Sequence, residues 1–306
     1  VNVMLEEHLK QHFKFDTFRP GQREVIQSIV DGNDTLAIMP TGGGKSLCYQ
    51  LPALINDNIT LVVSPLIALM KDQVDALQAR GIPSAFINSS LETRDIREIE
   101  QDVRSRSIQV LYVAPERFKS PRFARLLSEI DIGLFAVDEA HCISQWGHDF
   151  RPDYRIMAEQ IKGIRNRPTV AAFTATATPE VNEDIVKRLQ LKDPHVYVRG
   201  FNRSNLHFFA REGLKDTERV NEVLRLVKSM KGSGIVYALR KKETEEIATF
   251  LTENGVKAVA YHAGLDKNLR TRIQQDFMDD KYKVIVATIA FGMGVDKADV
   301  RFVIHA

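Results

Sequence analysis

The sequence is poor in cysteine and in long apolar runs. Its 306 residues include two cysteines, Cys48 and Cys142, and neither lies in a CxxC or CxxxH pattern. A disulfide framework is therefore excluded, no zinc motif is indicated, and we expect two ordinary buried thiols. No stretch approaches eighteen consecutive apolar residues, and the first thirty residues include charged side chains where a signal peptide would have its apolar core. These absences predict a soluble, intracellular protein without membrane attachment.

A large excess of charge of one sign is also absent. The chain has 42 Lys and Arg against 40 Asp and Glu, and 44% of its residues are hydrophobic, which excludes a disordered chain and a dominant polybasic or acidic tail. The charge is nevertheless uneven, because residues 199–306 carry a net charge of +5 and residues 1–198 carry −3. The C-terminal third could therefore bind an anionic polymer, although a merely solvated basic face remains an alternative.

Short apolar runs alternate with stretches of helical periodicity, such as 67–80 and 92–104, which is typical of an α/β fold with a mainly parallel sheet flanked by helices. We expect a first series of strands at 35–39, 60–64, 84–87, 109–113, 134–138 and 170–174. After a polar run at 198–205, a second series is expected at 235–237, 257–260, 283–287 and 302–304. The repeated pattern predicts two domains, residues 1–198 and residues 199–306.

A glycine-rich turn, Met39-Pro-Thr-Gly-Gly-Gly-Lys-Ser46, follows the first expected strand and precedes an apolar run. Backbone amides in such a turn can surround a phosphate, a lysine supplies a positive charge, and a serine hydroxyl can coordinate magnesium. The motif departs from GxxxxGK[ST] only at Met39, which is far from the amides nearest the lysine. We therefore predict an ATP site with Mg²⁺, formed by Thr41, Gly42, Gly43, Gly44, Lys45 and Ser46.

An acidic pair, Asp138 and Glu139, follows the expected strand at 134–138. Ligands of open α/β sheets collect at the carboxyl ends of the strands, so this pair should face the phosphate-binding turn. We predict that Asp138 holds the magnesium ion together with Ser46, and that Glu139 orients and deprotonates the attacking water. The predicted catalytic residues are Lys45, Asp138 and Glu139.

In this order, the turn, the Asp-Glu-Ala-His box and the motifs below resemble superfamily 2 helicases, and their details resemble the RecQ family of DNA helicases. Residues 142–154 are similar to the aromatic-rich loop of that family. Residues 15–22 resemble its adenine-reading segment, which implies that Gln22, with Arg19 beside it, binds the adenine edge. The resemblance runs from about Leu5 to the last residue, and it implies two RecA-like domains, of which the second is incomplete.

The aromatic-rich segment also has chemistry of its own. Trp146 and Phe150 offer flat faces on which unpaired bases can stack, while His148 and Arg151 can contact phosphates or base edges. Because the segment leaves the strand end that carries the acidic pair, DNA binding could be transmitted to hydrolysis. The alternative is that both aromatic side chains belong to the core and cap the sheet.

Further residues are assigned by the resemblance. They fall into three groups: contacts to nucleic acid at Ser64, Arg240 and Thr288; coupling residues His141, Thr174 and Thr176; and nucleotide contacts from the second domain at Gly294 and Asp296. Each of these segments alone could be an ordinary turn at the end of a strand. Their order along the chain favours the helicase interpretation.

We therefore predict an ATP-dependent DNA helicase that couples hydrolysis to translocation on single-stranded DNA and to unwinding of forked duplexes in repair or recombination. The resemblance implies a 3′ to 5′ direction, and a monomer is expected. Its location would be the bacterial cytoplasm, at the nucleoid, or the nucleus of a eukaryote. The alternatives are an RNA helicase and an ATP-gated DNA-binding fragment. The last alternative arises because the chain ends in an expected strand, before the family's arginine motif, so that we expect slow hydrolysis and no unwinding.

Overall fold

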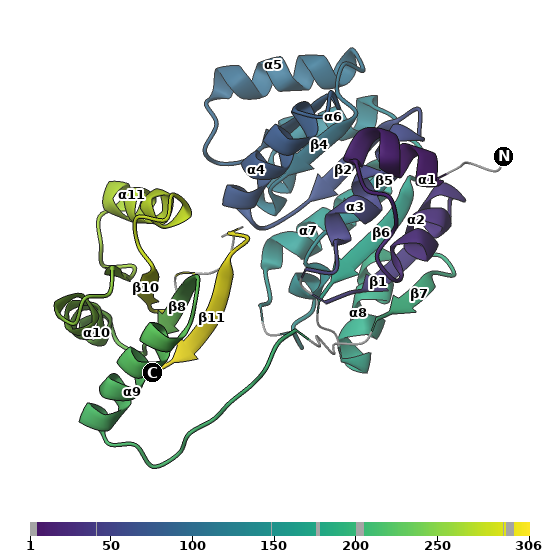
Figure 1. Cartoon of the computed structure of the whole chain (residues 1–306). Coiled ribbons are helices and arrows are strands. Elements are labelled where there is room, and N and C mark those ends of the chain that lie inside the picture. The colour runs from purple at the N-terminus through teal and green to yellow at the C-terminus, as the bar shows by residue number, and fades with distance from the viewer. Residues whose placement is uncertain are drawn as a thin grey trace. The chain divides into compact units, whose positions relative to one another are not determined.

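The computed structural model describes residues 5–40, 42–147, 149–175, 178–199, 205–289, 291 and 297–306. The chain divides into two compact units, Val1–Arg203 and Ser204–Ala306 (Figure 1). Each unit is an α/β layer structure with its own sheet and its own apolar clusters. Within the described residues, no helix combines the length and the apolar character needed to cross a membrane.

The first unit is built on a seven-stranded sheet with the order β3-β4-β2-β5-β6-β1-β7. The strands are β1 (Thr35–Ile38), β2 (Ile59–Val63), β3 (Ser84–Ile87), β4 (Val110–Val113), β5 (Ile132–Val137), β6 (Thr169–Thr174) and β7 (His195–Val198). All of the described pairings are parallel, and β1 pairs with β6 and β7. Six of these strands lie where the apolar runs of the sequence predicted strands, whereas β7 was not predicted.

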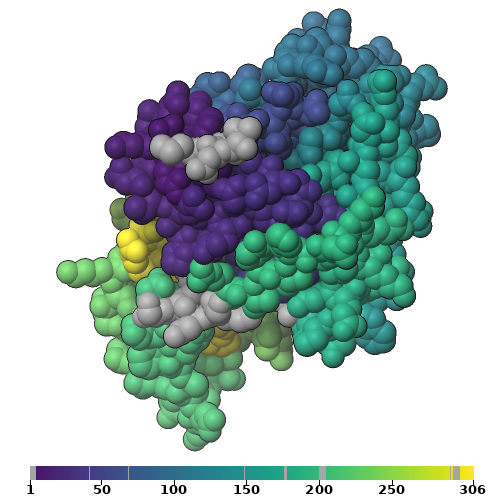
Figure 2. Space-filling view, turned by 90° about the vertical axis from the view of Figure 1, so that its right-hand side faces the viewer, coloured from purple at the N-terminus to yellow at the C-terminus, as the bar shows by residue number. Residues whose placement is uncertain are grey.

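Helices cover both faces of this sheet, which explains why its strands are apolar on both sides. They are α1 (Leu5–His8), α2 (Gln22–Val30), α3 (Lys45–Gln50), α4 (Ile67–Gln78), α5 (Thr93–Arg104), α6 (Pro121–Glu129), α7 (Pro152–Gln160) and α8 (Pro179–Leu189). Short helical turns are η1 (Leu9–Phe13), η2 (Pro52–Leu54), η3 (Pro115–Lys119), η4 (Ala140–Ile143) and η5 (Ile161–Gly163). The N-terminal helices lie at the surface, as the purple atoms in Figure 2 show.

Alternate residues of β1 show how the sheet separates two cores. Leu36 and Ile38 belong to one apolar cluster, to which α5, α6, α7 and α8 contribute, while Ala37 belongs to another, to which α1, α2, α3 and α4 contribute. Successive side chains of a strand point to opposite faces, so a strand inside this sheet, such as β1, supplies both clusters. The strand ends are thereby fixed between two packed layers.

The second unit has a four-stranded sheet with the order β11-β8-β10-β9, again with parallel pairings. Its elements are α9 (Asp216–Ser229), β8 (Ser233–Tyr237), α10 (Lys241–Glu253), β9 (Ala258–Tyr261), α11 (Lys267–Met278), β10 (Val284–Ala287) and β11 (Val300–His305). No residue with a side chain fits in place of Gly234 in β8, because a Cβ atom there would lie 2.0 Å from the Phe302 ring. The predicted fold class, two parallel α/β domains, is confirmed.

Candidate nucleotide and catalytic site

The glycine-rich turn lies between the buried strand β1 and the first residue of α3, Lys45. Gly42 and Gly44 have φ angles of +78° and +79°, in the left-handed region that favours glycine. At Gly43 a Cβ atom would lie 2.8 Å from the carbonyl oxygen of Pro40, so a larger residue would displace the turn. These glycines shape the backbone as the phosphate-binding motif predicts, while Thr41 lies outside the described residues.

Arg19 and Gln22 contact this turn directly. The Gln22 side chain donates from Nε2 to the Gly44 carbonyl at 3.0 Å and accepts from the Arg19 backbone amide at 2.8 Å. Arg19 donates through Nη1 to the Gly42 carbonyl. The two residues that the resemblance assigns to the adenine therefore lie beside the phosphate-binding turn and hydrogen bond to it.

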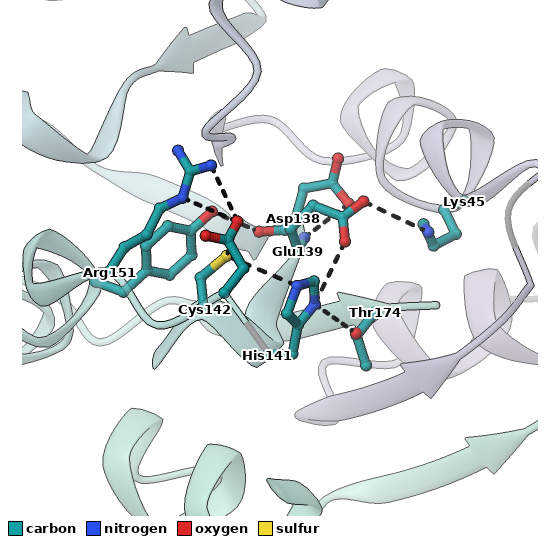
Figure 3. Close-up of polar contacts among 9 residues, drawn as sticks. Lys45, Asp138, Glu139, His141, Cys142, Arg151 and Thr174 are labelled. Atoms are coloured by element: carbon teal, nitrogen blue, oxygen red, sulfur yellow. Dashed lines mark hydrogen bonds and ion pairs between the residues drawn. The ribbon is translucent and has the colours of Figure 1, made fainter. Parts of the chain in front are cut away.

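The acidic pair follows β5. The backbone amide of Asp138 donates to the Val63 carbonyl of β2 at 2.8 Å, which continues the sheet up to the catalytic position. Glu139 has a φ angle of +47°, a rare conformation for a residue with a side chain and one that often marks functional sites. This bend places Glu139 Oε1 3.8 Å from Lys45 Nζ (Figure 3). The structure thus brings together the three residues predicted to be catalytic.

The Asp138 carboxyl group is buried, and burial raises its pKa to about 6, with a further increase from the charge of Glu139 and a decrease from Lys45. The backbone amide of Glu139 donates to its Oδ1 at 3.0 Å. An ionised carboxylate with so little solvent is costly unless a cation balances it, and Mg²⁺ prefers oxygen ligands. The buried Asp138 carboxylate therefore has the donor chemistry that suits a magnesium ion at this position.

His141 and Thr174 extend the acidic pair. His141 Nδ1 lies 2.9 Å from Thr174 Oγ1 at the end of β6 and 3.4 Å from Glu139 Oε2. A continuous polar path therefore connects Lys45, Glu139, His141 and Thr174 (Figure 3). Thr176, the second predicted coupling residue, lies outside the described residues.

The aromatic-rich segment leaves η4 and enters α7. The side chain of Trp146 is 78% exposed, so the core interpretation is wrong for this residue. Phe150 is partly buried, and the Arg155 guanidinium lies over its ring at 4.8 Å from the centroid. The segment is fastened to the site because Tyr154 Oη donates to the Asp138 carbonyl at 2.8 Å. His148 lies outside the described residues.

Arg151 is held by an acidic neighbour that the sequence analysis did not single out. Its Nε and Nη2 atoms donate to Asp149 Oδ2 at 3.1 and 3.0 Å, and its backbone amide donates to the Cys142 carbonyl at 2.8 Å. The hydrogen bond from Arg151 lowers the pKa of Asp149. Asp149 and Tyr154 were not predicted as site residues, although the sequence contained a signal for each. Asp149 stands in an Asp-x-Arg spacing with Arg151, and Tyr154 lies on the apolar face of a helix, near its start.

The remaining predicted contacts lie on other segments of the chain. Ser64, at the end of β2, is buried and accepts from the Leu66 amide at 3.4 Å. Arg240 and Thr288 belong to the second unit, where Arg240 is exposed just before α10 and lines a cavity of about 520 Å³ between α9 and α10. Gly294 and Asp296 lie outside the described residues. Both cysteines are buried and free, as predicted.

Comparison with known proteins agrees with this geometry. Residues 19–185 match the DEAD/DEAH box helicase family, and residues 217–306 match the helicase conserved C-terminal domain. The chain therefore belongs to the DEAD/DEAH box helicase family. The predicted resemblance to RecQ helicases is confirmed by the relatives described next.

The chain is 46% identical over 298 residues to the ATP-dependent DNA helicase RecQ of Haemophilus influenzae, covering 97% of this chain and 48% of the relative. It is 44% identical over 299 residues to RecQ of Bacillus subtilis, covering 97% of this chain and 50% of the relative. The chain thus spans about half the length of the curated relatives it matches.

Solved structures with the same fold include Mycobacterium smegmatis helicase Lhr bound to ssDNA and AMP-PNP, with a TM-score of 0.73 and 19% identity over 99% of this chain and 43% of that chain. Another is S. cerevisiae Dbp5 bound to RNA and ADP BeF3, with a TM-score of 0.73 and 18% identity over 97% of this chain and 77% of that chain. At these identities the likeness shows the fold alone.

Proposed function

We propose that this chain forms the ATPase motor of a RecQ-type DNA helicase, with residues 1–198 as the ATP-binding domain and residues 199–306 contributing the second domain. The observation that carries the proposal is the convergence of Lys45, Asp138 and Glu139 at the carboxyl edge of one sheet, from which the chain continues into a segment with an exposed tryptophan. The names of the relatives support DNA as the nucleic acid.

The chemical step is ATP hydrolysis. When bound, Mg²⁺ neutralises phosphate charge, and Asp138 and Ser46 are the residues that would hold it. Lys45 contributes a fixed positive charge next to the glycine amides. In the structure this charge faces Glu139 at 3.8 Å. When a nucleotide phosphate pairs with Lys45 in place of Glu139, the Glu139 carboxylate becomes available to accept a proton from water. Nucleotide binding itself therefore prepares the base.

Coupling to DNA uses the path from the aromatic-rich segment to the base. Trp146 is exposed and can stack on an unpaired base, and Tyr154 fastens the same segment to the Asp138 carbonyl. A DNA phosphate competes with Asp149 for Arg151, because both are anionic acceptors for one guanidinium. Release of Arg151 from Asp149 is thus the local event through which single-stranded DNA changes the catalytic segment.

The discriminating experiment compares ATP hydrolysis by the purified chain with single-stranded DNA and with RNA of equal length and matched sequence, in Mg²⁺ and in EDTA. We expect stimulation by DNA that exceeds stimulation by RNA and is lost in EDTA. Equal or greater stimulation by RNA would favour an RNA helicase. Lys45→Ala should abolish hydrolysis, while the exposed Lys71→Ala, whose side chain pairs with Asp75 on α4, is the matched control and should remain active.

Unwinding is a separate question, since the relatives named as helicases are about twice as long as this chain. We propose translocation from 3′ to 5′ by a monomer on forked DNA. A strand-displacement assay with 3′-tailed, 5′-tailed and forked duplexes tests the direction, and sedimentation at the assay concentration tests the oligomeric state. Hydrolysis that is stimulated by DNA but gives no displacement would identify the chain as a DNA-dependent ATPase that does not unwind.

A further inference from the structure

Three side chains of different chemistry, those of His141, Cys142 and Asp149, lie close together next to the acidic pair. Cys142 Sγ lies 3.8 Å from His141 Nε2 (Figure 3) and 3.7 Å from Asp149 Oδ2. One potential ligand atom from each residue lies within 4.8 Å of the other two. His141 and Cys142 are buried, whereas the Asp149 side chain is 37% exposed, so the cluster has an opening toward solvent.

We propose that His141, Cys142 and Asp149 form a binding site for one thiophilic divalent cation, represented by Zn²⁺, distinct from the magnesium site at Asp138. A nitrogen, sulfur and oxygen ligand set suits zinc, whereas magnesium takes oxygen ligands. This site could not be predicted from the sequence, because the three residues do not follow a known ligand spacing. They come together only where the aromatic-rich segment folds back on η4.

The separations fit the size of the ion. With Zn–S about 2.3 Å and Zn–N and Zn–O about 2.0–2.2 Å, a tetrahedral shell places its ligand atoms roughly 3.4–3.6 Å apart. The two measured distances from Cys142 Sγ exceed this range by only a few tenths of an ångström. The third separation, between the ligand atoms of His141 and Asp149, shortens toward this range if the partly exposed Asp149 side chain rotates toward His141. Three protein ligands leave the fourth position to water, as in open zinc sites.

The histidine already has the support that a metal ligand needs. Its Nδ1 lies 2.9 Å from Thr174 Oγ1 and 3.4 Å from Glu139 Oε2, while Nε2 faces the cysteine sulfur. A hydroxyl or carboxylate at the nitrogen that does not bind the metal fixes the ring orientation of a ligating histidine and raises its basicity. In the tautomer that donates from Nδ1, the Nε2 lone pair points toward the proposed ion.

Binding has two consequences that can be measured. Burial raises the pKa of the Cys142 thiol to about 12, so the ion must displace its proton: Cys–SH and Zn²⁺ give Cys–S–Zn⁺ and H⁺. The ion also takes Asp149 Oδ2, which accepts both hydrogen bonds from Arg151. A divalent cation repels the guanidinium, so zinc binding and the Arg151–Asp149 pair exclude each other. If the proposed function holds, zinc therefore produces the release of Arg151 that DNA otherwise produces, and hydrolysis in the presence of zinc depends less on DNA.

The test titrates Co²⁺, and then competing Zn²⁺, into the whole chain after chelator treatment, without ATP or DNA. We expect one equivalent of Co²⁺ with a thiolate-to-cobalt absorption band that Zn²⁺ removes. Cys142→Ser should abolish the band, and Asp149→Asn should weaken binding by about tenfold or more. The matched control is Cys48→Ser, which removes the other buried cysteine, on α3, and should keep the band.

A missing band, or an equal band in Cys142→Ser, would overturn the site. If Cys142→Ser does not fold, the wild-type chain still decides the question through maleimide labelling mapped by mass spectrometry. We expect Zn²⁺ to slow labelling of Cys142 and to leave Cys48 unaffected. No protection, or equal protection of both thiols, would contradict the proposal. Because neither readout involves hydrolysis, a failure of the ATPase proposal would be recognised separately.

Discussion

Replacing Asp138 with asparagine should make the protein more stable while destroying its activity. The Asp138 carboxyl group is buried, and its pKa is raised from 3.8 to about 6, first by burial and then by the charge of Glu139. The folded state therefore prefers the protonated acid. The stability that this preference provides is complete below pH 3.8 and is lost as the pH rises through 6. Asparagine never ionises, so it avoids this loss.

The magnitude follows from the two pKa values. A difference of about 2 pKa units, at about 1.4 kcal/mol per unit, gives about 3 kcal/mol at pH 8 in favour of Asp138→Asn. For a unit of this size, 1 kcal/mol changes Tm by about 2–4 °C, so the expected gain in Tm is about 6–12 °C. The amide retains an oxygen that can accept from the Glu139 backbone amide, as Oδ1 does in the structure. The gain should shrink to near zero at the acidic end of the range.

The assay is urea unfolding between pH 4 and pH 8 in EDTA, without nucleotide. Near-UV circular dichroism of the fully buried Tyr49, Tyr112 and Tyr154 reports on the unit that contains Asp138, because all three lie in the first unit. Saturating Mg²⁺ should reduce the difference, because the ion stabilises only the wild-type carboxylate. An Asp138→Asn protein that is no more stable than wild type at pH 8, or whose gain does not depend on pH, would refute the reasoning.

Asp149→Asn is a control of opposite sign. Its hydrogen bond from Arg151 lowers the pKa of this carboxyl group, so the charged form contributes stability above its ordinary pKa. That contribution is lost as the pH falls through the lowered value. Neutralising Asp149 should therefore reduce stability at pH 8 and have less effect in acid. If the stability changes of the Asp138 and Asp149 variants depend on pH in opposite ways, the effect of burial on a carboxyl group is distinguished from the effect of pairing with a positive charge.

Four further variants test the site. Lys45→Ala should weaken nucleotide affinity, while Glu139→Gln should retain affinity and lose about 10²–10⁴ in turnover; normal turnover in Glu139→Gln would exclude it as the base. Trp146→Ala should change stability by no more than about 0.5 kcal/mol, since the side chain is exposed, yet remove stimulation by single-stranded DNA; continued stimulation would contradict a stacking role. Tyr154→Phe removes the buried donor to the Asp138 carbonyl and should cost about 1–3 kcal/mol in urea unfolding, an effect that an unchanged midpoint would disprove.

The buried strands of both units could be predicted from the sequence, because strands covered by helices on both faces must be continuously apolar. The strand β7 could not. Its residues His195–Val198 form an edge strand with one neighbour, and most of its side chains are exposed, so no buried apolar run marks it. Local patterns report burial, and β7 has little of it.

The candidate site divides in the same way. The glycine-rich turn and the acidic pair are short motifs whose chemistry is visible in a few adjacent residues. The hydrogen bond from Gln22 to Gly44 spans 22 residues of sequence, and the Tyr154 contact to Asp138 spans 16. Such contacts depend on how the elements pack, so they required the structure. The exposure of Trp146, which excludes a core position for this side chain, also came from the structure.

The position of β1 in its sheet has a consequence for the order of folding during synthesis. Both neighbours of β1 are late elements, since β6 begins at Thr169 and β7 at His195. A ribosome adding about 5–20 residues per second therefore leaves this strand without a hydrogen-bonded neighbour for roughly 7–27 seconds after Thr35 is joined to the chain. During that interval the glycine-rich turn has no rigid strand to hold it, and the nascent chain cannot retain a nucleotide. The glycine-rich turn is therefore synthesised well before the two strands that hold β1 in place.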